Sequence, residues 1–171
     1  MAKLIRNRRV DADSWQLLKR DPAGAIDIPD AGDVIVPLAT WQERRDALRG
    51  RAGRTGVWLD GPEGPEALGA DLADLPIIAI YFSNFGDGRG FSSARLLRER
   101  HGYRGEIRAF GTVIRDWMLF MERCGFDSYW LRDDEEVDNA LAAFAELPQT
   151  YQASVTEPQP LFRRRAAKAG A

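Results

Sequence analysis

The chain has 171 residues, of which 44% are hydrophobic and 29% are charged, and its formal net charge is −2. This composition is typical of a globular protein, but the length is short of the roughly 250 residues of a complete eightfold barrel. The small net charge argues against a nucleic-acid binder, although basic residues gather near both ends of the chain.

Strand-like and helix-like segments alternate along most of the chain. Residues 1–18 fit a short strand or hairpin at an edge, and residues 21–33 form a loop rich in proline and glycine. Further on, apolar β-branched runs alternate with segments whose apolar residues recur every three or four positions. Strands are predicted at 34–38, 57–59, 77–82, 106–110 and 126–131. Helices are predicted at 41–49, 66–73, from an N-cap at Ser92–Ser93 to Gly102, at 113–124 and at 137–147.

Short strand–helix–strand connections imply parallel strands joined by right-handed crossovers. We predict an α/β domain over residues 1–150, in which five strand–helix units form a mostly parallel, doubly wound sheet. The alternative is an incomplete TIM-like barrel. Residues 151–171 are predicted to form a basic tail that is extended or disordered, in which the segment 159–165 is a candidate for docking a partner.

The loop after the third predicted strand is the strongest candidate site. In open α/β sheets, ligands bind beyond the carboxyl ends of the strands. Glycines let a ligand approach the backbone, and a helix N-terminus attracts anions. Nearby arginines supply bidentate donors for phosphate, sulfate or carboxylate. The predicted anion-binding residues are Gly86, Gly88, Arg89, Gly90, Ser92, Ser93, Arg108 and Arg115.

Structural roles also explain these residues. Asp-Gly-Arg-Gly is good turn sequence, and its glycine spacing matches neither the dinucleotide fingerprint nor a Walker phosphate-binding loop. Asp87 and Asp116 are candidates for an acid or base, but turn formation explains Asp87 and the helix dipole explains Asp116. Arg108 lies in a strand and needs a partner, either a bound anion or a carboxylate such as Asp116 or Asp127.

Metal sites and membrane spans are not predicted. With a single cysteine, Cys124, and a single histidine, His101, the chain lacks the ligand set of a zinc, haem or iron–sulfur site. Any redox cofactor would be organic or carried by another protein. One cysteine also excludes an internal disulfide, which fits a reducing cytoplasm. No apolar run approaches ~20 residues and no signal peptide opens the chain, so we expect a cytoplasmic protein without membrane contact.

Two long motifs resemble a known family. D-G-R-G-F-S-x-A-R-L-L-R-E-R-x-G-Y-x-G-E-I-R-A and R-D-x-x-x-F-M-x-R-C-G-F-D resemble the bacterial family catalogued as domain of unknown function 934. V-I-V-P-L-x-x-W, G-V-W-L and the terminal Q-P-L-F-R-R-R also fit it, so the resemblance covers nearly the whole chain. Where many members have Gly-Asp after the strand, this chain has Gly111-Thr112, which removes a natural acid or base; Thr112 serves as an N-cap.

The resemblance implies a pathway more firmly than a reaction. Members are commonly labelled as oxidoreductases involved in sulfite reduction, because their genes neighbour those of assimilatory sulfite reductase. We expect an accessory protein of sulfur assimilation that acts with sulfite reductase or its electron donor. The alternative is a small enzyme whose phosphorylated or sulfur-oxyanion substrate is held by the same loop and arginines. An oxidoreductase with bound flavin or nicotinamide ranks last, because its fingerprint is missing.

Overall fold

A computed structural model describes residues 3–147 and 149–169 of the chain. The strands are β1 (Lys3–Arg6), β2 (Arg9–Asp11), β3 (Trp15–Leu17), β4 (Asp33–Pro37), β5 (Thr55–Leu59), β6 (Ile77–Phe82), β7 (Glu106–Gly111) and β8 (Ser128–Leu131). The α-helices are α1 (Leu38–Arg49), α2 (Arg89–Glu99), α3 (Met118–Cys124), α4 (Val137–Ala143) and α5 (Leu161–Ala169). Two 3-10 helices, η1 (Pro65–Ala73) and η2 (Arg115–Trp117), complete the connections.

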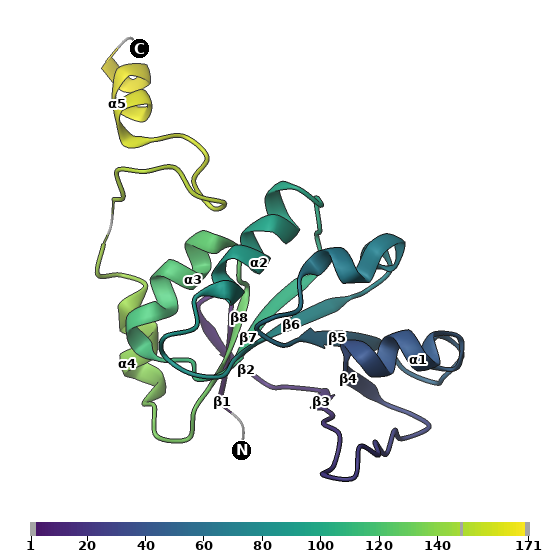
Figure 1. Ribbon diagram of the computed structural model, residues 1–171. Coiled ribbons are helices and arrows are strands. Elements are labelled where there is room, and N and C mark those ends of the chain that lie inside the picture. The colour runs from purple at the N-terminus through teal and green to yellow at the C-terminus, as the bar shows by residue number, and fades with distance from the viewer. Residues whose placement is uncertain (1–2, 148, 170–171) are drawn as a thin grey trace.

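All eight strands belong to one sheet, in the order β2-β1-β8-β7-β6-β5-β4-β3. From β3 to β8 the strands are parallel and follow the order of the chain. β1 and β2 form an antiparallel hairpin, and β1 is antiparallel to β8. The sheet curls into a half-barrel, with helices α1 to α4 along its outer side (Figure 1).

The doubly wound sheet is therefore a wrong prediction, although the mixed α/β class and the mostly parallel pairing are confirmed. A doubly wound sheet reverses its strand order and carries helices on both faces. Here each right-handed crossover moves in the same direction across the sheet, which leaves the helices on a single face. The half-barrel is compatible with the incomplete-barrel alternative. The five predicted units also differ from the structure, because η1 is a 3-10 helix and β3 is a further strand. The hairpin predicted at an edge within residues 1–18 is confirmed as β1 and β2.

Alternate residues of the strands build two different cores. On the side of the helices, residues such as Ile78 and Ile80 of β6 pack with the buried faces of α1, α2 and α3. The opposite side, which we call the inner face, is rich in aromatic side chains. Its apolar residues are Trp15, Leu17, Ile35, Trp58, Ile77, Ala79, Tyr81, Phe110 and Trp130. Aromatic rings on successive strands contact one another there, for example Tyr81 and Phe110, whose ring centroids lie 5.1 Å apart.

The connection from β2 to β3 crosses the inner face near its amino end. Arg108 of β7 is fully buried there and donates through Nη1 to Asp13 Oδ2 at 2.7 Å. Its Nη2 donates to Glu106 Oε1 at 2.8 Å. This ion pair fastens the first strands across the half-barrel, because Asp13 comes from the connection between the two edges of the sheet.

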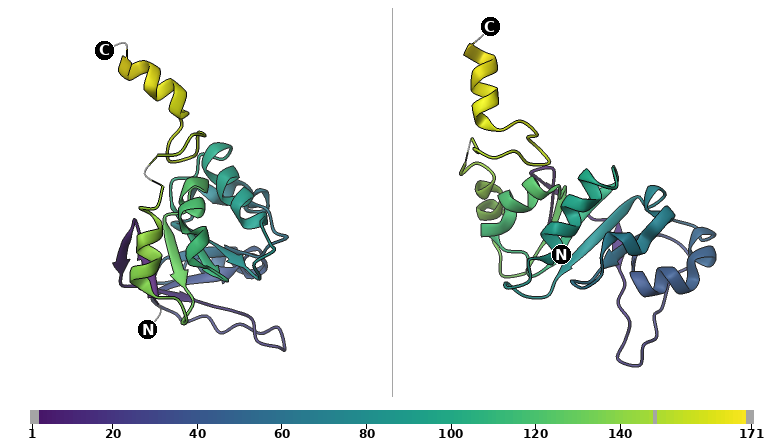
Figure 2. Two further views of the ribbon diagram at one scale, coloured as in Figure 1. Left: turned by 90° about the vertical axis from the view of Figure 1, so that its left-hand side faces the viewer. Right: turned by 45° about the horizontal axis from the view of Figure 1, so that its top comes forward.

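The carboxyl-terminal segment differs from the predicted extended or disordered tail. Helix α5 occupies Leu161–Ala169, and it stands apart from the sheet and its helices (Figure 2). Arginine, alanine, leucine and lysine all favour a helix, and here they outweigh the charge of the segment. None of the helices in the described residues combines the length and the apolar character that a membrane span requires.

Candidate functional site

The predicted loop lies between β6 and α2, at the carboxyl end of the sheet. Helix α2 begins at Arg89, with Gly88 as its N-cap residue, so the predicted N-cap at Ser92–Ser93 is wrong. Ser92 and Ser93 lie inside the helix, where the Ser93 hydroxyl donates to the backbone carbonyl of Arg89 at 3.3 Å. The earlier start follows from Asp87, whose carboxylate accepts a hydrogen bond from the Arg89 backbone N–H at 3.2 Å.

Asp87 and Arg89 form a two-point ion pair at this helix N-terminus. Arg89 Nε donates to Asp87 Oδ1 at 2.9 Å, and Arg89 Nη2 donates to Oδ2 at 2.8 Å. The side-chain hydrogen bonds from Arg89 lower the pKa of Asp87 to about 2, with a further contribution from the Arg89 backbone N–H. The carboxylate of Asp87 thus takes the position that a bound anion would occupy, and turn formation accounts for this residue.

The glycines of the loop have different surroundings. A Cβ atom on Gly90 would lie 2.6 Å from the Phe82 ring, so this glycine allows α2 to pack closely on β6. Gly86 and Gly88 are exposed, and a Cβ atom on Gly88 would meet its nearest neighbour at 3.9 Å. A glycine of the preceding loop, Gly61, packs against the Asp87–Arg89 pair, where a Cβ atom would lie 2.4 Å from Asp87 Oδ2.

Arg89, Arg108 and Arg115 do not converge. Arg108 faces the inner side of the sheet, whereas the loop leads into a helix on the outer side. Arg115 pairs with Glu146, and its Nε donates to Asn139 Oδ1 at 2.9 Å. Each of the three guanidinium groups is thus paired with a carboxylate of the same chain. Structural ion pairs, the ordinary explanation for such arginines, account for these positions.

Asp116, the other candidate acid or base, lies in η2 and is exposed. Its carboxylate is 3.6 Å from Arg115 Nη1. Neither it nor Asp127 is the partner of Arg108. Asp127 instead pairs with Arg98 and accepts a hydrogen bond from the Ile107 backbone N–H at 2.8 Å, and burial raises its pKa.

An exposed cluster of aromatic side chains borders the loop. We call it the aromatic surface, and it consists of Phe85, Phe91, Trp117 and Phe120. Phe85 is 67% exposed and stacks on Trp117 with ring centroids 5.1 Å apart and an interplanar angle of 17°. Phe120 is 52% exposed and lies 5.0 Å from the Phe91 ring. Buried Phe82 supports Phe91 and Trp117 from beneath.

Sequence reasoning missed this surface because its members come from four separate elements. Phe85 lies in the loop, Phe91 in α2, Trp117 in η2 and Phe120 in α3. Trp117 and Phe120 fit the apolar stripe of the helix predicted at 113–124 and looked like core residues. Phe85, which lies between Asn84 and Gly86, is the residue from which this surface could have been predicted. A large aromatic side chain in a polar loop has no apolar neighbours in the sequence to pack against.

Comparison with known proteins identifies one family. The sequence profile of a family described as "Bacterial protein of unknown function (DUF934)" matches residues 56–162. The match begins in β5 and ends in α5, so it includes the loop, the aromatic surface and the start of the carboxyl-terminal helix. Among curated proteins, none matches the chain.

Proposed function

Because the chain belongs to the DUF934 family of bacterial proteins, we propose that it is an accessory protein of assimilatory sulfite reduction. In this proposal it works in the cytoplasm, where it binds sulfite reductase or the electron donor of that enzyme. The pathway comes from the label that members of the family commonly carry. The mode of action, binding to a protein partner, comes from the surface chemistry of the chain.

The aromatic surface is the observation that carries the proposal. Contiguous exposed aromatic side chains mark sites of protein interaction, and aromatic residues dominate the energetics of interfaces. With roughly 200 Å² for a whole aromatic side chain, the exposed parts of Phe85 and Phe120 sum to roughly 200–250 Å². Burying that area against a partner corresponds to about 5–6 kcal/mol of transfer free energy. Two side chains therefore supply enough energy to anchor an interface.

The pairing of the arginines favours an accessory protein over the alternative enzyme. An oxyanion substrate at the loop would have to displace the Asp87 carboxylate from Arg89, which holds it by two side-chain hydrogen bonds. Arg115 is held by Glu146, and Arg108 lies on the other face of the sheet. An enzyme that binds this substrate class would need at least one of these groups to be free.

Binding to sulfite reductase tests the proposal. The wild-type protein is titrated onto immobilised sulfite reductase and onto its electron donor, beside the double variant Phe85→Ser/Phe120→Ser. We expect the double variant to bind at least about tenfold more weakly. A matched control, Val10→Ser/Leu147→Ser, removes two exposed apolar side chains from other parts of the surface and should bind like the wild type. Failure of the wild-type protein to bind either partner would refute the accessory function.

The enzyme alternative has its own test. Thermal unfolding is followed with sulfite, sulfate, phosphate, and flavin or nicotinamide nucleotides, for the wild type and for Arg89→Ala. An anion that stabilises only the wild-type protein, by RT ln(1 + [L]/Kd), would place a small-molecule site on the loop. That outcome would favour the enzyme, and an absence of any shift would favour the accessory protein.

The segment 159–165 extends the proposed contact. Phe162 is 54% exposed, and the neighbouring Arg163 and Arg165 are exposed as well. Arg164 holds the base of α5 by donating to the Thr150 carbonyl at 2.9 Å. We expect deletion of residues 159–171 to weaken partner binding and to leave the unfolding midpoint of the domain unchanged, because α5 stands apart from the sheet (Figure 2).

A further inference from the structure

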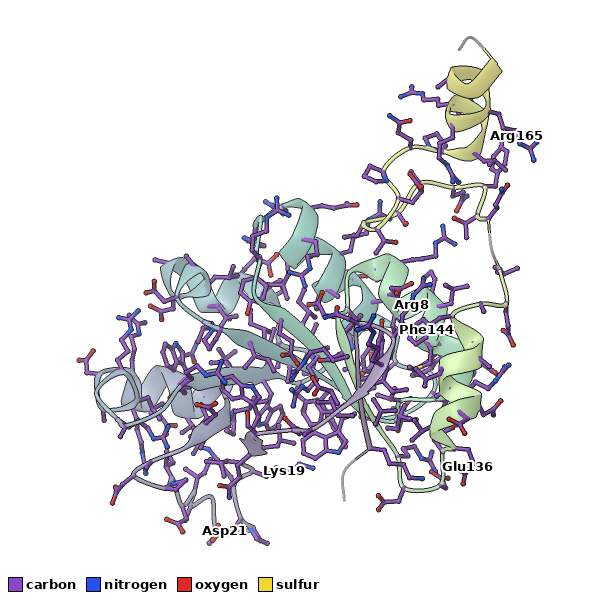
Figure 3. The ribbon with its side chains drawn as sticks, turned by 180° about the vertical axis from the view of Figure 1, so that it is seen from behind. Arg8, Lys19, Asp21, Glu136, Phe144 and Arg165 are labelled. Carbon is purple, nitrogen blue, oxygen red and sulfur yellow. The ribbon has the colours of Figure 1, made fainter. Side chains whose placement is uncertain are left out.

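A small pocket opens at the carboxyl end of the inner face, on the side of the sheet away from the aromatic surface. It has a volume of about 250 Å³, and its lining includes the apolar Leu17, Phe110 and Trp130 and the charged Lys19, Arg132 and Asp133. Figure 3 shows the molecule from this side, with Lys19 labelled. The carboxyl ends of parallel strands are where barrel folds hold their ligands.

The curl of the sheet creates this pocket. Leu17 and Lys19 belong to β3 and the residues after it, whereas Trp130 and Arg132 belong to β8 and the loop after it. β3 and β8 are separated by four strands in the sheet, and still their residues line one pocket. Phe110 of β7 also lines the pocket, and Tyr81 of β6 packs against that ring.

The lining combines two aromatic rings with two cations, Lys19 and Arg132, and one carboxylate, Asp133. Phe110 and Trp130 directly follow Ala109 and Tyr129, which are paired between β7 and β8. Lys19 is exposed at the rim, and within the described residues its ammonium makes no salt bridge; it lies 5.6 Å from the centroid of the Tyr81 ring. Arg132 brings a second cation, which is held at the surface by Asp134 at 2.6 Å.

We propose that this pocket binds a small planar aromatic anion. The ring of the ligand stacks on Trp130 and Phe110, and its carboxylate or equivalent acidic group pairs with Lys19. Arg132 is neutralised by Asp134, so Lys19 is the cation available to the ligand. The pocket is smaller than the roughly 300–1,000 Å³ of sites for drug-sized molecules, which limits the ligand to one or two rings. This inference is independent of the accessory function and uses none of the residues of the aromatic surface.

Three matched probes separate the contributions of ring and charge. Benzoate has both, benzamide has the ring without the charge, and acetate has the charge without the ring. Each is titrated onto the ¹⁵N-labelled protein while the indole N–H signal of Trp130 is followed by NMR, with Trp130→Phe used to assign that signal. We expect a saturable shift with benzoate, and at least about tenfold weaker binding of benzamide and acetate.

Two substitutions of an exposed side chain then test the ammonium. Lys19→Met removes the charge and should weaken benzoate binding about tenfold while leaving benzamide unaffected; Lys19→Arg should keep most of the affinity. Phe85→Ser serves as the control on the opposite face and should bind benzoate like the wild type. The proposal is overturned if benzoate leaves the Trp130 signal unmoved. It is equally overturned if Lys19→Met binds benzoate as tightly as the wild-type protein does. The same holds if Phe85→Ser, and not Lys19→Met, loses affinity for benzoate.

Discussion

The buried guanidinium of Arg108 offers the sharpest test of how the half-barrel is held together. Arg108→Met keeps most of the apolar stem and removes the charge. It leaves the carboxylate of Asp13 without its ion-pair partner at a site where that side chain is 9% exposed. Glu106 loses the hydrogen bonds from Arg108 Nε and Nη2 but keeps Arg6, whose Nε lies 3.2 Å from Glu106 Oε2.

The expected loss of unfolding free energy is about 3–5 kcal/mol, the usual result of removing one partner of a buried ion pair. Asp13 accounts for most of it, because its remaining hydrogen bond to the side chain comes from the Trp15 backbone N–H at 3.1 Å. At about 2–4 °C per kcal/mol for a protein of this size, the unfolding midpoint should fall by about 6–20 °C.

Urea unfolding followed by circular dichroism gives the free energy, and thermal unfolding gives the midpoint. Arg95→Met is the matched control: it removes an exposed i,i+4 pair with Glu99 and should cost no more than about 0.5 kcal/mol. Adding Asp13→Asn to Arg108→Met should recover part of the loss, because the unpaired carboxylate is then gone. A loss below about 1 kcal/mol for Arg108→Met would refute the reasoning, since the ion pair would then contribute no more than a surface pair.

Three further predictions follow from single residues. Gly111→Ala should lower the free energy of unfolding, measured in urea, by more than Gly24→Ala does. Both glycines have a positive φ, at +92° and +83°. Of the two, only Gly111 is crowded by backbone, because a Cβ atom there would lie 2.5 Å from the Phe82 carbonyl oxygen. The strain common to both is about 1–2 kcal/mol, so equal losses would contradict the predicted collision. The carboxylate of Asp87 should titrate with a pKa of about 2 in carbon-13 NMR and with a higher pKa in Arg89→Ala. Because the pKa of Asp87 is lower in the folded protein than the ordinary value of 3.8, the ion pair stabilises the folded state fully above pH 3.8. This stabilisation is lost as the pH falls through about 2. An unchanged pKa of Asp87 in Arg89→Ala would contradict this explanation. The thiol of Cys124 is buried, and burial raises its pKa, so a chromogenic disulfide reagent should modify it at least about tenfold more slowly in the folded protein than in urea.

The sequence predicted the central strands well and their arrangement poorly. The apolar run from Ile77 to Phe82 forms β6 with the predicted bounds, because a strand buried on both faces needs no alternation. That same lack of alternation hides which residues face the helices, so the pattern could not tell a doubly wound sheet from a half-barrel. The distinction depends on strand order, which arises from pairings such as Leu4 with Trp130.

The candidate site was predictable as a turn and less so as a set of interacting groups. Asp87 and Arg89 are two residues apart, and their pairing is local. The partner of Arg108 is Asp13, which lies 95 residues away in the sequence, so no local pattern links the two. The aromatic rings of the inner face did leave a signal, since Tyr81, Phe110 and Trp130 each occupy one alternating face of a predicted strand. That signal acquires meaning only when the strands are known to be neighbours.

The pairing of the first strand with the last one has a consequence for synthesis on the ribosome. β1 leaves the ribosome before the other strands, but its neighbour in the sheet besides β2 is the last strand, β8, with Lys3 paired to Leu131 in an antiparallel ladder. Strands β3 to β7 can assemble in order as they emerge, whereas β1 must wait until nearly the whole domain has been made. Closing so long a loop is an entropically costly and slow step. The hairpin of β1 and β2 is therefore the last part of the sheet to be secured, and until then β8 presents an unpaired edge to other nascent chains.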